Sequence, residues 1–84
     1  MAKISSELEQ QLRSMPNRKI DLIVRTFGDV TPQLDWLASE GLQVPQQYRL
    51  SPGVAVTSTG ADALKLIGQD WVKSVETDAP VSAM

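Results

Sequence analysis

The chain closes on the stretch Trp71-Val72-Lys73-Ser74-Val75-Glu76-Thr77-Asp78-Ala79-Pro80-Val81-Ser82-Ala83-Met84. Its first part predicts a β-strand, with Val72 and Val75 as the apolar positions and two acids, Glu76 and Asp78, at its end. The residues that follow are small or apolar, a composition suited to a peptide that another protein holds. We expect the rest of the chain to form a domain that presents this segment.

Length and composition limit the classes of function. A chain of 84 residues with 42% hydrophobic and 21% charged residues fits one small globular domain. It has no cysteine and no histidine, so disulfides, thiolate metal sites and the commonest general base are excluded, and no metal, cofactor or enzymatic activity is expected. The net charge of −2, without a basic run, argues against nucleic acid as a partner.

The same sequence predicts neither a membrane span nor a secretory signal. No apolar run approaches the roughly 20 residues that cross a bilayer. The first residues, 1–7, are too polar for a signal peptide. We therefore expect a cytoplasmic protein without a membrane partner.

Residues 4–15 predict a short amphipathic helix. Ile4, Leu8, Leu12 and Met15 recur on one face, and the proline that follows ends the helix. A helix this short is marginally stable alone. We expect it to pack on its own domain, and a partner protein is the alternative.

Residues 19–27 predict the clearest strand. Leu22 and Val24 alternate with polar residues, as in a half-buried strand. Ile23 and Phe27 add apolar groups to the polar face, which indicates that this second face also meets something. A partner interface, a weak homodimer and burial under the N-terminal helix are the three alternatives for these two residues.

The remaining elements alternate in type along the chain. A helix over 31–40, a hairpin over 43–58, a helix from 59 to 68 and the last strand follow in order. This β-α-β-β-α-β order predicts an α+β, ferredoxin-like split βαβ fold, a four-stranded antiparallel sheet with two helices on one face, plus the extra N-terminal helix. Ile23 and Phe27 would lie on the open face of that sheet.

The second half of the chain resembles a known family. The strand Val54-Ala55-Val56-Thr57, the helix over 61–66 and the pattern apolar–x–x–Val75–Glu76–x–Asp78, with six residues after it, resemble the propeptide and inhibitor family of subtilisin-like serine proteases. The resemblance covers residues 19–84, with residues 1–18 as an additional helix and linker. It implies a domain over 19–78, an extended tail over 79–84, and a free-standing inhibitor that resembles an intramolecular folding chaperone.

The resemblance also implies how the C-terminal segment acts. The acids Glu76 and Asp78 would meet the N-termini of helices on the protease, where carboxylates are favoured. An extended peptide binds a protease by adding a strand to it. The binding residues of the tail would be Pro80, Val81, Ser82, Ala83 and Met84, with Met84 in the primary specificity pocket and the terminal carboxylate near the oxyanion hole, as in a bound product.

Other functions remain open at the level of the sequence. A tail that is frayed and solvated would leave a non-inhibitory interaction module that uses the open sheet face or the N-terminal helix. The predicted fold also occurs in small-molecule regulatory domains and RNA-binding domains. The predicted sheet lacks the aromatic pair that stacks RNA bases, so we rank the RNA-binding hypothesis below the protease inhibitor and the interaction module.

Overall fold

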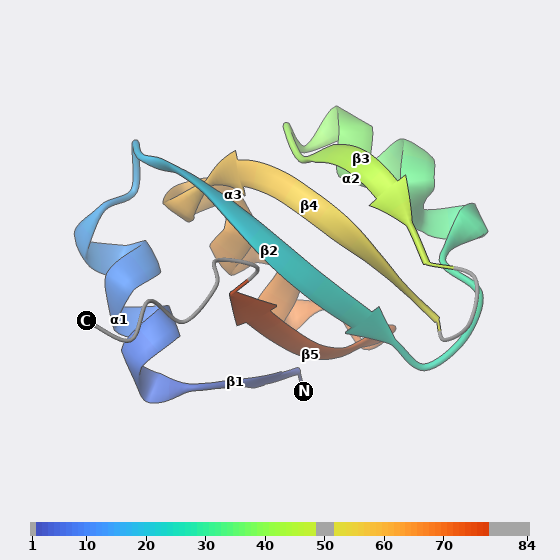
Figure 1. Cartoon of the computed structure of the whole chain (residues 1–84), viewed down its shortest axis with the longest axis horizontal. Coiled ribbons are helices and arrows are strands. Elements are labelled where there is room, and N and C mark those ends of the chain that lie inside the picture. The colour runs from blue at the N-terminus through green and yellow to red at the C-terminus, as the bar shows by residue number, and fades with distance from the viewer. Residues whose placement is uncertain (1, 49–51, 78–84) are drawn as a thin grey trace.

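The computed structural model describes residues 2–48 and 52–77, which form one mixed sheet with helices packed against it (Figure 1). The strands are β1 (Lys3–Ile4), β2 (Lys19–Thr26), β3 (Gln43–Gln47), β4 (Gly53–Thr59) and β5 (Val72–Thr77). The α-helices are α1 (Ser6–Ser14), α2 (Leu34–Ser39) and α3 (Gly60–Leu64). There are also two short 3-10 helices among the described residues: η1 (Thr31–Gln33) precedes α2, and η2 (Lys65–Gly68) continues α3.

The strand order across the sheet is β1-β5-β2-β4-β3. The strand β2 lies at the centre and pairs antiparallel with both β4 and β5, while β3 pairs antiparallel with β4 at one edge. The other edge is β1, which runs parallel to β5 with Lys3 opposite Ser74 and Ile4 opposite Val75. Because β1 flanks it, β5 is an internal strand.

The predicted fold class is therefore wrong. The structure has a five-stranded mixed sheet and three α-helices, not a four-stranded antiparallel sheet with two helices and an appended one. The missing strand is β1, whose residue Ile4 had been assigned to the first helix. That helix starts at Ser6, because the hydroxyl of Ser5 accepts a hydrogen bond from the backbone N–H of Leu8 at 3.1 Å and so caps it.

The core lies between the sheet and the helices. Leu22 and Val24 of β2 are fully buried on the helix side, together with Leu12 of α1, Leu37 of α2 and Val56 of β4. The N-terminal helix thus packs on its own domain, as the sequence analysis favoured. Replacing one such leucine by alanine typically costs about 2–5 kcal/mol of stability.

A close approach of backbones joins α1 to α3. A Cβ atom at Gly60 would lie 2.5 Å from the carbonyl oxygen of Leu12 and 2.8 Å from that of Met15. No side chain larger than hydrogen fits there without moving one helix from the other. The first turn of α3 is therefore held against the end of α1.

Candidate functional site

The end of β5 carries the first of the predicted site residues. Glu76 lies opposite Ile23 of β2, on the sheet face that points away from the helices. Its Oε2 atom accepts from Nε of Arg25 at 3.1 Å, and the two side chains are 54% and 46% exposed. A pair this exposed contributes at most about 1 kcal/mol, so a partner could take over either charge at little cost.

A small apolar centre surrounds Ile23 on the open face. Ile23 is half-buried and pairs with Ala55 of β4, which is only 6% exposed. Polar groups border this centre, since the hydroxyl of Thr57 donates to Asp21 at 2.7 Å. The open face is therefore mostly polar, with Ile23 and Ala55 as its apolar part.

Phe27 does not join that centre. It follows the last residue of β2, and its backbone N–H donates to the carbonyl oxygen of Trp71 at 3.2 Å, at the start of β5. Its 66% exposure makes it the one large apolar side chain exposed among the described residues. The structure thus places Ile23 beside Glu76 and places Phe27 at the opposite end of β5.

The other predicted site residues, Asp78 and the tail Pro80-Val81-Ser82-Ala83-Met84, lie outside the described residues. Thr77 is the last described residue. The candidate site can therefore be described at the end of β5 and on the surfaces next to it.

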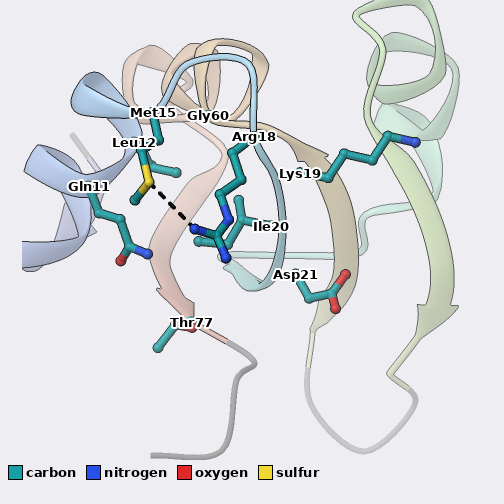
Figure 2. Close-up of a pocket in the computed structure, with 9 residues that line it drawn as sticks. All are labelled: Gln11, Leu12, Met15, Arg18, Lys19, Ile20, Asp21, Gly60 and Thr77. Carbon is teal, nitrogen blue, oxygen red and sulfur yellow. Dashed lines mark hydrogen bonds between the residues drawn. The ribbon is translucent and has the colours of Figure 1, made fainter.

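A cavity of about 270 Å³ adjoins Thr77, between the end of α1, the loop that follows it and the start of β2 (Figure 2). Its lining includes Gln11, Met15 and Arg18. The sequence analysis missed this site. The adjacent cations Arg18 and Lys19 after a Pro-Asn turn were a possible signal, but their approach to Thr77 depends on the sheet register.

Two shallower grooves follow the outer strands of the sheet. One, of about 590 Å³, runs along β1 and β5 and is lined by Ile4, Leu8 and Val75 among others. The other, of about 640 Å³, lies between α2 and β3 and includes Leu34 and Val44. Each groove has mostly apolar walls; the first also includes Lys3, Glu76 and Thr77, whereas the lining of the second has no charged residue.

Among the described residues, Asp29 and Lys65 have shifted pKa values, and both lie away from the end of β5. The backbone N–H and the hydroxyl of Thr31 both donate to Asp29 and lower the pKa of its carboxyl. The carboxylates of Asp62 and Glu40 raise the pKa of Lys65. These shifts describe local turns and helix contacts rather than acid–base chemistry in a cleft.

Over residues 2–48 and 52–77, no group of three or more potential metal-ligating side chains comes together. No helix in that part of the chain is long and apolar enough to cross a membrane. Comparison with known proteins finds no matching family model and no matching curated sequence.

Proposed function

We propose that this protein inhibits a cytoplasmic subtilisin-like serine protease by placing residues 79–84 in the active site of the protease. One observation carries the proposal: Glu76 is exposed at the C-terminal end of β5, the last strand before that segment in the sequence. The partner is a protein, and neither nucleic acid nor a membrane takes part.

The position of β5 favours this mode of action. Strand β2 pairs with it as far as Thr77, β1 flanks it at Ser74 and Val75, and its own side chains Val72 and Val75 are buried in the core. The last residues of the strand are thereby fixed relative to the core. A peptide that starts from a fixed point loses less freedom when it binds, which favours a product-like complex.

Glu76 would contribute through its charge. On binding, its carboxylate exchanges Arg25 for the N-terminus of a helix on the protease, a contact of about 0.3–1 kcal/mol when exposed. Asp78 would act in the same way. Ile23 lies beside Glu76 on the neighbouring strand and would extend the contact over the sheet, toward Ala55 on the strand beyond it.

The proposal depends on β5 and on the segment after it, not on the class of the sheet. An additional role as a folding chaperone would use the same surface, since a protein that binds the native protease stabilises it by mass action.

The second candidate is a non-inhibitory interaction module, and it is favoured by the apolar centre of Ile23 and Ala55 on an uncovered face. The N-terminal helix is a poor contact surface for either function, because Leu8 and Leu12 face the core.

Deleting residues 81–84 tests the proposal. We expect the full chain to inhibit a subtilisin-like protease competitively and the deletion to weaken inhibition at least about 100-fold. Val81 and Met84 would each lose about 1.5–3 kcal/mol of burial in the protease. Circular dichroism should show an unchanged fold.

Phe27→Ala is the matched control, because Phe27 lies at the other end of β5 and should not affect inhibition. Equal inhibition by the full chain and the deletion variant would refute the tail mechanism. If the shortened protein still binds without inhibiting, and Ile23→Lys abolishes that binding, the interaction module is the correct function.

A further inference from the structure

The cavity beside Thr77 is formed by a loop that backbone hydrogen bonds hold in place. The backbone N–H of Arg18 donates to the carbonyl oxygen of Met15 at 3.2 Å, and the carbonyl oxygen of Arg18 accepts from Gly60 at 3.2 Å. The N–H of Ala61 donates to the carbonyl oxygen of Pro16 at 3.1 Å. The loop therefore carries Arg18 in a fixed position next to α3.

The Arg18 side chain has unused hydrogen-bonding capacity. A guanidinium carries five N–H donors, whereas the contact that Arg18 makes is with the sulfur of Met15 at 3.7 Å, a weak acceptor. Within the described part of the chain no carboxylate forms an ion pair with Arg18, although Arg13 and Arg25 each pair with one carboxylate and Lys65 pairs with two.

The orientation of the side chains aims this charge into the cavity. Figure 2 shows Arg18 and Gln11 pointing toward one another, whereas Lys19 points away. Ile20 contributes an apolar wall where it packs against the core, and the buried Leu12 lies behind the lining. The site thus combines one inward-pointing cation and an amide with an apolar surface.

We propose that this cavity binds a carboxylate attached to a short apolar group, with Arg18 as the ion-pair partner. Its volume of about 270 Å³ lies just below the roughly 300–1,000 Å³ of sites for drug-sized ligands, so the ligand is small. Arg18 can bind both oxygens of a carboxylate side by side. The negative charge of Asp21 at the rim repels a doubly charged phosphate more strongly than a singly charged carboxylate.

Two sources can supply this carboxylate. One is a free small carboxylic acid, and the other is Asp78 of the same chain, which follows the cavity residue Thr77 directly in sequence. The chemistry at Arg18 is the same for both sources. The proposal does not depend on the inhibition of a protease.

Titration of the full chain with isovalerate, followed by the backbone amide resonances in NMR, tests the proposal. We expect saturable shifts at residues 15 and 17–20 and at Gly60 in the wild type, in Asp78→Asn, or in both. Arg18→Gln, made in the background that binds, should weaken binding about tenfold or more, because it removes a charge-assisted pair. Lys73→Gln removes an exposed cation that does not line the cavity and should leave binding unchanged.

Isovaleramide, which has the same shape without the charge, should produce no such shifts. The proposal is overturned if the amide binds equally well, if Arg18→Gln binds as tightly as its parent, or if neither the wild type nor Asp78→Asn binds isovalerate. Tighter binding by Asp78→Asn identifies the chain's own acid as the occupant of the free protein. Equal binding by the two proteins identifies a free carboxylate as the ligand.

Discussion

The two ends of β5 are built differently. At its start, Trp71 packs edge to face against Trp36 of α2, with ring centroids 5.7 Å apart and planes at 81°. The backbone N–H of Phe27 donates to the carbonyl oxygen of Trp71 at the same end. At its end, backbone packing at Gly60 positions a loop, while Arg18 and Glu76 keep their charged groups exposed. One end is held together by large side chains, and the other leaves charged groups exposed, where a partner can reach them.

This difference indicates where to look for function in a small domain. Side chains that pack against each other stabilise the fold and are unavailable to a ligand. Where backbone contacts hold the chain instead, side chains such as Arg18 and Glu76 remain available without loss of stability. The following predictions test whether the two ends of β5 differ in this way.

The largest expected effect is at Gly60. Gly60→Ala should lower the free energy of unfolding by about 2–3 kcal/mol, because the new Cβ atom would overlap the carbonyl oxygens of Leu12 and Met15. Gly28→Ala, at the other end of β5, is the matched control, since nothing lies within 4 Å of its Cβ position. Urea unfolding monitored by tryptophan fluorescence measures both. Equal effects of the two substitutions would contradict the role of backbone packing at the end of β5.

The ion pair at the end of β5 should have a smaller effect. A double-mutant cycle of Arg25→Gln and Glu76→Gln should give a coupling of about 0.5 kcal/mol, as expected for an exposed pair, and less at 1 M salt. Urea unfolding of the four proteins at low and high salt provides the measurement. A coupling above about 2 kcal/mol would mean that Glu76 is committed to Arg25 and unavailable to a protease.

The sequence predicts the long central strand β2 better than the short edge strand β1. Leu22 and Val24 alternate with polar residues over a long strand, so β2 is evident from its period of two. The strand β1 contains only Lys3 and Ile4, which is too short to show any period, and its pairing with β5 joins residues about 70 positions apart. A local pattern carries no signal for such a contact, and the predicted fold class failed for this reason.

The same argument applies to the candidate site. The position of Glu76 at the end of a strand could be predicted, because a strand pattern and an acid at its end are local features, while its role in binding stays a prediction. The position of Ile23 opposite Glu76, and that of Arg18 near Thr77, depend on the register between β2 and β5 and on the packing of α1 on α3. These are long-range contacts, so sequence reasoning could not predict them and overlooked Arg18.

The smallest expected effect concerns Asp29, at the end of the sheet where β5 starts. Its carboxylate accepts from the N–H of Thr31 at 2.9 Å and from the hydroxyl of Thr31 at 2.8 Å, and these bonds lower its pKa below the ordinary value of 3.8. Because the pKa is lower in the folded state, the contribution of Asp29 to stability is fully present above pH 3.8 and is lost as the pH falls through the lowered value. Urea unfolding of wild type and Asp29→Asn between pH 7 and pH 2 should therefore show a difference in stability that is constant at neutral pH and shrinks in acid. A difference that does not change with pH would mean that the Thr31 hydrogen bonds do not favour the charged form.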